Sequence, residues 1–168
     1  MPGTAAMGMP RVDFYLSDPA TEGARLHLIC RLVDKAYAAG RPTLVLGDDR
    51  RELAALDELL WTSLDGSFIP HELAAADAPA ADTGTGAAYE SPVLLATQVP
   101  GQFPRALLIN LGHEVPAAAG EFERVIEVPG GDAASRQQAR VRFRAYRRLG
   151  AEPATHQVGG QPAAGRPL

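Results

Sequence analysis

The stretch Gly40-Arg-Pro-Thr-Leu-Val-Leu46 decides the fold class, because it joins the end of a helix to a short buried strand. Residues 42–46 are almost entirely apolar, which is typical of a strand covered on both faces in a parallel sheet. Before them, residues 20–39 carry apolar side chains at helical spacing, and Gly40 ends that pattern. A helix that leads directly into a buried strand indicates an α/β protein.

The same alternation extends in both directions from this stretch. Further strands are predicted at residues 11–16, 93–97, 106–111 and 122–128, and further helices at residues 50–60 and about 136–148. Asp48 or Asp49 is expected to cap the first of these helices, and Asp132 or Ser135 the second, which ends at Gly150. We therefore expect an α/β, Rossmann-like three-layer fold with a mainly parallel central sheet and helices on both faces.

A single domain accounts for the 168 residues, since a chain of this length can bury a sizeable core. We expect this domain to span residues 11–149, after a flexible leader at residues 1–10. The low-complexity, Ala-rich segment 74–88 predicts a mobile loop. The segment 150–168, rich in Pro, Gly and Ala, predicts a disordered tail.

The composition excludes several classes of protein. Cys30 is the single cysteine, so a disulfide framework and a cysteine-based zinc site are excluded, and its apolar surroundings predict a buried structural thiol. The first ten residues lack the charged start and apolar core of a signal peptide. No stretch approaches the roughly 18 apolar residues of a membrane span. We expect a cytoplasmic, soluble protein that does not bind a membrane.

The first predicted strand-to-helix turn, at residues 16–23, argues against a nucleotide-binding loop. It contains neither G-x-G-x-x-G nor G-x-x-x-x-G-K-[ST], and its Asp18 and Glu22 would repel a phosphate group. No cofactor is therefore expected. The four histidines are not at metal-ligand spacing from one another or from Cys30, so no metal is expected either.

Asp48 and Asp49 keep an enzymatic alternative open. They directly follow the strand at residues 42–46, and ligand sites of open α/β sheets lie at such strand ends. Helix capping is the favoured role for both, and the G-x-S-x-G elbow of α/β hydrolases is absent. We expect no catalytic residues, with a small hydrolase-like enzyme as the weaker alternative.

The last predicted helix concentrates positive charge in an acidic protein. Six of the 16 basic residues lie between residues 136 and 148, although the net charge is −4. At about 100° per residue, an arc of roughly 80° contains Arg136, Arg140, Arg144 and Arg147. Phe143 lies at the edge of this arc. Because arginine binds carboxylates through paired hydrogen bonds, we expect a ligand that has carboxylates and an apolar group.

A solvated charged face is the alternative interpretation of this helix. No acidic residue occurs between residues 133 and 149, so the arginines have no acidic partner four positions away, and this favours a ligand. The opposite side of the helix, with Val141, Ala145 and Leu149, is predicted to pack against the protein body.

A second candidate site gathers aromatic residues at the end of the helix at residues 50–60. Trp61 is the only tryptophan, and Phe68 follows seven residues later beside Pro70 and His71. These side chains are either core residues or interface anchors, since Trp and Phe are enriched in interface cores.

Several short motifs resemble a known family. Residues 56–61 (Leu-Asp-Glu-Leu-Leu-Trp) and 67–71 (Ser-Phe-Ile-Pro-His) resemble the LDE-x-LW and SFxPH signature of the chi subunit of bacterial DNA polymerase III. The opening strand at residues 12–16, the stretch 40–45 and the last helix around residues 139–147 are also similar to that family. The resemblance covers about residues 11–149.

The resemblance implies a non-catalytic accessory subunit of the clamp-loader complex, within the DNA polymerase III holoenzyme (EC 2.7.7.7). Chi-family proteins bind the acidic C-terminal tail of single-stranded DNA-binding protein (SSB) and the small psi subunit, so they reach DNA only through SSB. A monomer or a heterodimer with psi is implied. Direct binding of single-stranded nucleic acid by the arginines is the alternative, which the acidic remainder of the chain disfavours.

The resemblance also implies two sets of site residues. The SSB-tail pocket corresponds to Val128, Arg136, Arg140, Phe143 and Arg144. The surface for psi, or for another partner such as a helicase, corresponds to Trp61, Phe68, Pro70 and His71. Arg136 and Arg144 stand where the family pattern has lysine, and Phe143 where it has tyrosine, so the charge and the ring are kept while a hydroxyl group is lost.

Overall fold

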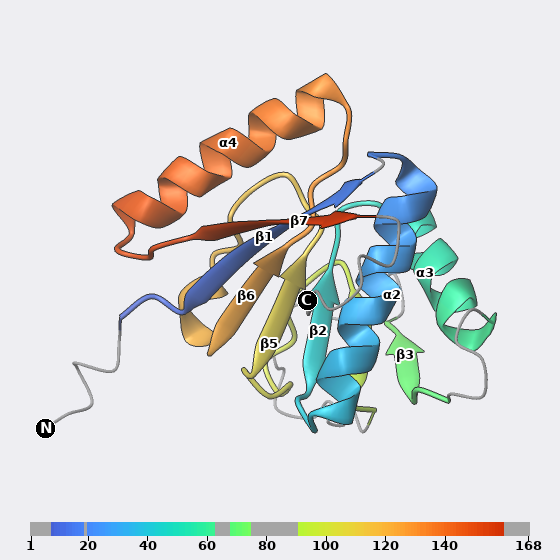
Figure 1. The fold of residues 1–168 in the computed structure, drawn as a ribbon. Helices are drawn as coiled ribbons and strands as arrows, with labels where there is room; N and C mark the ends of the chain where they lie inside the picture. The colour runs from blue at the N-terminus through green and yellow to red at the C-terminus, as the bar shows by residue number, and fades with distance from the viewer. Residues whose placement is uncertain (1–7, 19, 63–67, 75–90, 160–168) are drawn as a thin grey trace, which may run out of the picture.

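A seven-stranded parallel sheet forms the centre of the protein (Figure 1). The computed structural model describes residues 8–18, 20–62, 68–74 and 91–159. Within them the strand order is β3-β4-β2-β5-β6-β1-β7, and every neighbouring pair runs parallel. The strands are β1 (Arg11–Asp18), β2 (Thr43–Leu46), β3 (His71–Leu73), β4 (Val93–Ala96), β5 (Leu107–Asn110), β6 (Arg124–Glu127) and β7 (Ala154–Gly159). The predicted α/β fold is confirmed.

Helices cover both faces of the sheet, as the sequence predicted. They are α2 (Glu22–Ala38), α3 (Arg50–Thr62), α4 (Ala133–Arg148) and a short 3-10 helix, η1 (Ala119–Glu121). Helices α2 and α3 lie on one face and α4 on the other (Figure 1). Within the described ranges, no helix is long and apolar enough to cross a membrane.

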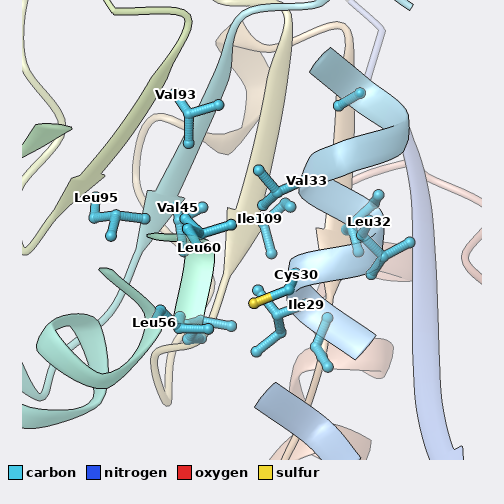
Figure 2. Packing of buried hydrophobic residues seen from close by; sticks show 14 of the residues in the cluster. Ile29, Cys30, Leu32, Val33, Val45, Leu56, Leu60, Val93, Leu95 and Ile109 are labelled. Atoms are coloured by element: carbon cyan, nitrogen blue, oxygen red, sulfur yellow. The ribbon is translucent and has the colours of Figure 1, made fainter. Parts of the chain in front are cut away.

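One core fills the space between the sheet and helices α2 and α3 (Figure 2). Ile29 and Val33 of α2 pack in one cluster with Val45 and Ile109 from neighbouring strands. Each fully buried side chain of this kind contributes roughly 1.5–3 kcal/mol to stability. Cys30 is buried in the same cluster, which confirms the predicted buried thiol.

The second core lies on the opposite face, beneath α4 and two loops. The rings of Phe14 in β1 and Tyr146 in α4 meet in a T-shaped contact, with centroids 6.0 Å apart. Phe103 and Phe122 extend this core from the loops that precede β5 and β6. Beside α4, Leu16 near the end of β1 is only half-buried, so the outer part of the sheet stays accessible there.

The end of the described chain corrects one prediction. The expected disordered tail is wrong for residues 154–159, because they form the edge strand β7, which pairs with β1 over six residues. His156 stabilises this pairing: its ring stacks on Tyr15 with centroids 4.7 Å apart, and its Nε2 lies 2.8 Å from Oδ1 of Asp13. Residues 160–168 of the expected tail lie outside the described residues.

The other two segments predicted to be mobile are mostly outside the described residues. Of the expected leader, residues 1–7 are not described, while Pro10 is buried and Met9 packs against the second core, so the prediction is wrong for these two. Of the expected loop at residues 74–88, only Ala74 is described, and it is buried in the second core.

Asp13 is a buried carboxylate at the contact between β1 and β7. Its Oδ2 lies 3.0 Å from Nη2 of Arg124, and its Oδ1 faces His156. Burial alone would raise the pKa of this carboxyl, but hydrogen bonds from His156 and Arg124 outweigh burial and hold the pKa below its ordinary value of 3.8. A carboxyl with a lowered folded-state pKa stabilises the fold above its unfolded-state pKa, and that stabilisation is lost as the pH falls through the folded-state value.

Replacing Asp13 with asparagine is expected to remove this acid-sensitive contribution. The wild-type protein should be more stable than Asp13→Asn near neutral pH, and the difference should shrink as the pH falls below about 4. Urea unfolding at a series of pH values measures both free energies. A difference that stays constant down to about pH 2 would contradict this account of Asp13.

Candidate functional site

The loop between β6 and α4 brings the start of α4 close to the turn after β1. Asp132 caps α4: its Oδ2 accepts a hydrogen bond from the Ser135 backbone N at 3.1 Å, and its Oδ1 accepts one from Ser135 Oγ at 2.6 Å. These hydrogen bonds lower the pKa of the Asp132 carboxyl. A Cβ atom added to Gly131 would lie 2.3 Å from the backbone oxygen of Ala20, so only glycine allows this close approach.

Helix α4 buries a different face from the one predicted. Val141 and Leu149 are 49% and 56% exposed, so the prediction that they pack against the body is wrong. The buried face consists of Ala139, Arg142 and Tyr146 instead. The apolar pattern was misleading because a charged residue, Arg142, points inward.

A buried polar network around Glu127 explains this rotation of α4. The Glu127 carboxylate, fully buried at the end of β6, accepts hydrogen bonds from Arg142 Nε at 2.9 Å, Tyr146 Oη at 2.6 Å and Asn110 Nδ2 at 2.8 Å. Arg142 Nη1 also donates to the His113 carbonyl oxygen at 3.1 Å. Burial raises the pKa of Glu127, and the charge of Arg142 opposes that rise. The network fixes which side of α4 faces solvent.

A pocket of about 380 Å³ lies between α4 and the outer strands β1 and β7. Its apolar lining comes from Phe14, Leu16, Ala20, Ala139 and Phe143. Its positive charge comes from Arg136 and Arg140 of α4. The remaining lining residues are Ser17, Pro129, Gly130, Gly131, Thr155 and Gln157. The pocket therefore combines a cationic rim with an apolar floor.

Three of the five residues predicted for the SSB-tail pocket come together there: Arg136, Arg140 and Phe143. The ring of Phe143 is half-buried and packs on Phe14, with centroids 5.4 Å apart. Arg140 Nη1 donates to Gln137 Oε1 at 3.2 Å. Within the described part of the chain, neither arginine forms an ion pair with a carboxylate, so both charges are available to a ligand.

The other two residues predicted for the SSB-tail pocket lie outside this pocket. Val128 has no exposed surface and does not line the pocket, so its predicted role as a pocket wall is wrong. Its carbonyl oxygen accepts a hydrogen bond from Arg25 Nε at 2.8 Å, which holds it on the α2 side of the sheet. The next residues of the loop, Pro129 to Gly131, form the wall instead. Arg144 is exposed on α4 but outside the pocket.

Sequence reasoning missed the pocket residues on the sheet. The sequence predicts a strand for Phe14 and Leu16 but no role in a site, although their alternation with Asp13 and Tyr15 places them on one face. Thr155 and Gln157 lie in the segment for which the composition predicts a disordered tail. Only the long-range pairing of β7 with β1 brings them to the pocket.

The second candidate site is an exposed aromatic surface at the end of α3. Trp61 is 51% exposed and Phe68 is 63% exposed, with ring centroids 5.3 Å apart, so neither is a core residue. His71 is buried below Trp61, with centroids 4.4 Å apart, and its Nδ1 donates to the Ile69 carbonyl oxygen at 2.7 Å. Pro70 is half-buried. Trp61 and Phe68 are thus the accessible part of this set.

Asp48 and Asp49 both have structural partners. Asp49 Oδ1 accepts a hydrogen bond from the Arg51 backbone N at 2.8 Å, which confirms its predicted role as a cap of α3. Asp48 Oδ2 accepts one from the His113 backbone N at 3.0 Å and lies 3.2 Å from His113 Nδ1. In the residues that the structure describes, no group of His, Cys, Asp and Glu side chains is arranged to hold a metal ion. These contacts favour the capping role over the hydrolase alternative.

The fold and the pocket define the class of this chain: a Rossmann-like α/β protein whose main candidate site lies beside α4 rather than in a nucleotide-binding loop. Residues 9–154 match the family model described as DNA polymerase III chi subunit, HolC. The chain belongs to this family, which confirms the resemblance seen in the sequence.

Individual relatives agree with this assignment. The chain is 39% identical over 142 residues to the DNA polymerase III subunit chi of Pseudomonas aeruginosa, across 84% of this chain and 92% of that protein. It is 30% identical over 147 residues to the subunit chi of Escherichia coli, across 84% and 94% of the two chains. It is also 27% identical over 151 residues to the subunit chi of Haemophilus influenzae, across 88% and 96%. The chain is therefore similar to replication proteins over most of its length.

Proposed function

We propose that the protein is a non-catalytic adaptor that links the DNA polymerase III clamp-loader complex to SSB-coated DNA. It binds the acidic C-terminal tail of SSB in the pocket beside α4, and the psi subunit or another protein at the surface formed by Trp61 and Phe68. One observation supports this most: the pocket joins two arginines, unpaired among the described residues, to an apolar floor. That combination suits a peptide that ends in a carboxylate beside an apolar side chain.

Each part of the pocket has a role in this proposal. Arg140 binds the terminal carboxylate through two parallel hydrogen bonds, a geometry that only the planar guanidinium offers. Phe143 and Phe14, already in contact, bind the apolar side chain at the end of the tail in the apolar floor. Arg136 at the pocket rim and Arg144 outside it attract the acidic residues that precede the end of the tail.

The expected affinity is micromolar. Exposed charge pairs contribute about 0.2–1 kcal/mol each. A paired arginine–carboxylate contact and one buried apolar side chain add a few kcal/mol more. The sum is on the order of −8 kcal/mol, and it weakens as salt screens the charges. Weak binding of each tail suits a tether, because SSB carries several tails and their combined binding is much stronger.

Direct binding of single-stranded DNA is the second candidate function. The observation that favours it is the exposed row Arg144, Arg147 and Arg148, which lies outside the pocket on α4. Such a row could contact phosphates, but the net charge of −4 repels DNA, and only Phe143 and Tyr146 of α4 could stack on bases. Tyr146 is fully buried, which leaves little aromatic surface for bases.

Surface plasmon resonance with three immobilised targets tests the two functions against each other. The targets are full-length SSB on single-stranded DNA, SSB that lacks its acidic C-terminal tail, and bare single-stranded DNA. We expect binding to the first target only. Equal binding to tailless SSB, or salt-sensitive binding to bare DNA, would contradict the proposal and favour direct nucleic-acid binding.

Phe68→Ala is expected to weaken binding of the psi partner without changing binding of the SSB tail. We expect Phe68 to be one of the few hot-spot residues of this interface, which contribute about 2 kcal/mol or more each, so psi affinity should fall at least roughly 30-fold. Leu149→Ala is the matched control, because Leu149 is similarly exposed but lies at the end of α4. Calorimetric titration with purified psi and with a tail peptide separates the two surfaces. Unchanged psi affinity would exclude Phe68 from that interface.

A further inference from the structure

The edge strand β7 forms the outer wall of the pocket. In the register of the sheet, Thr155 lies beside Phe14 and Gln157 lies beside Leu16. Paired residues of neighbouring strands share one face, so both polar side chains lie on the same face as the apolar pocket floor. Figure 1 shows β7 running along β1 at the edge of the sheet, next to α4. Thr155 and Gln157 are therefore next to the floor that Phe14 and Leu16 form.

The alternate residues of β7 hold the strand in place. His156 stacks on Tyr15 and contacts Asp13, and Val158 packs against the core on the α2 side. Thr155 and Gln157 are exposed, and neither side chain hydrogen-bonds another described residue. The strand thus presents, on a fixed backbone, two polar side chains that have no hydrogen-bond partner in the described part of the chain.

The hydrogen-bonding chemistry of the pocket gives these two residues a role. The guanidinium groups of Arg136 and Arg140 can only donate hydrogen bonds, so they bind carboxylates but cannot bind the N–H groups of a peptide main chain. A peptide N–H that loses its water without gaining an acceptor costs about 1–3 kcal/mol. Among the described residues that line the pocket, side-chain acceptors occur only at Ser17, Thr155 and Gln157. Two of these three acceptors are on β7.

We infer that β7 is a recognition strand, in which Gln157 and Thr155 accept hydrogen bonds from main-chain N–H groups near the end of an acidic peptide held by Arg136 and Arg140. This inference rests on the proposed function and adds a neutral, directional contact to the charge-based one. The peptide lies between two walls: α4 binds its carboxylates, and β7 binds its backbone.

Fluorescence anisotropy with a labelled peptide of the SSB C-terminal tail tests this inference. The variants Thr155→Val and Gln157→Met keep the side-chain size but remove the hydrogen-bonding groups. The double variant should bind about tenfold more weakly than the wild type, with the same thermal midpoint and the same salt dependence, because no charge is removed. Gln98→Met is the matched control, since Gln98 is exposed outside the pocket and should leave the affinity unchanged.

A peptide N-methylated at its last two amide groups gives an independent measurement. Methylation should weaken binding to the wild type about tenfold and weaken binding to the double variant little further, because both changes remove the same hydrogen bonds. If the double variant binds the normal peptide as tightly as the wild type, or if the two losses simply add, the inference is wrong while the proposed function stands. If the wild type does not bind the normal peptide at all, the proposed function is wrong, and this inference falls with it.

Discussion

Replacing Arg142 with alanine is expected to lower the free energy of unfolding by about 3–5 kcal/mol, because Glu127 then stays buried without its ionic partner. The side chains of both residues are almost inaccessible to water, so solvent cannot compensate for the lost contact. Urea unfolding followed by circular dichroism measures the loss. Arg147→Ala is the matched control, since it removes the same side chain from an exposed position of α4 and should change stability by less than about 0.5 kcal/mol.

Lowering the pH should restore part of the stability that Arg142→Ala loses. Burial raises the pKa of the Glu127 carboxyl, and loss of the Arg142 charge should raise it further. A carboxyl with a raised folded-state pKa binds its proton more tightly in the folded than in the unfolded state, so folding becomes more favourable as the pH falls through that raised pKa. The stability difference from wild type should therefore shrink on acidification.

A neutral pair provides a further test of the Glu127 network. Glu127→Gln combined with Arg142→Met removes both charges and should recover much of the lost stability, because no buried charge is left unpaired. A cost of less than about 1 kcal/mol for Arg142→Ala would mean that the Glu127–Arg142 contact does not hold α4 in place.

Replacing Arg140 with alanine is expected to reduce affinity for the SSB tail about ten- to hundredfold while leaving the fold intact. A hydrogen-bonded contact to a charged group contributes about 1.5–3 kcal/mol, and Arg140 lines the pocket without a carboxylate partner in the described part of the chain. Calorimetric titration gives the affinity, and a melting curve shows that stability is unchanged. The affinity of the variant for the SSB tail should also depend less on salt concentration than that of the wild type.

Arg148→Ala is the matched control for the Arg140 variant. Arg148 is exposed on the same helix and carries the same charge, but it does not line the pocket. The affinity of Arg148→Ala for the SSB tail should fall only about twofold at low salt, because the substitution removes only a weak, long-range attraction. Equal losses for the two variants would mean that the helix acts as a diffuse basic surface rather than as one wall of a pocket.

The fold class was predictable because the elements that define it are encoded locally. The apolar run in β2 and the helical spacing in α2 can be read within windows of a few residues, and the structure has both elements. The capping residues Asp49 and Asp132 were also predictable, since an N-cap contacts backbone groups two or three positions away.

The features that sequence reasoning missed all depend on long-range partners. Strand β7 forms because it pairs with β1, and His156 contacts Asp13 across 143 positions of the chain. The buried face of α4 depends on Glu127, whose pairing with Arg142 makes a charged residue face inward. Periodicity alone places apolar residues inside, so it assigned Val141 to the core and overlooked Arg142. The sequence predicts the arginines on the α4 side of the candidate pocket. It does not predict the β7 side, because that side depends on the long-range pairing of β7 with β1.

Two tail peptides that differ only at their last group test directly whether the pocket beside α4 recognises a terminal carboxylate. One peptide ends in a free carboxylate and the other in a carboxamide, and both are titrated calorimetrically into the wild type and Arg140→Ala. We expect micromolar binding of the free peptide to the wild type, binding of the amide at least tenfold weaker, and similar weak binding of both peptides to Arg140→Ala. Equal affinity of the wild type for both peptides would contradict the claim that this pocket recognises a terminal carboxylate.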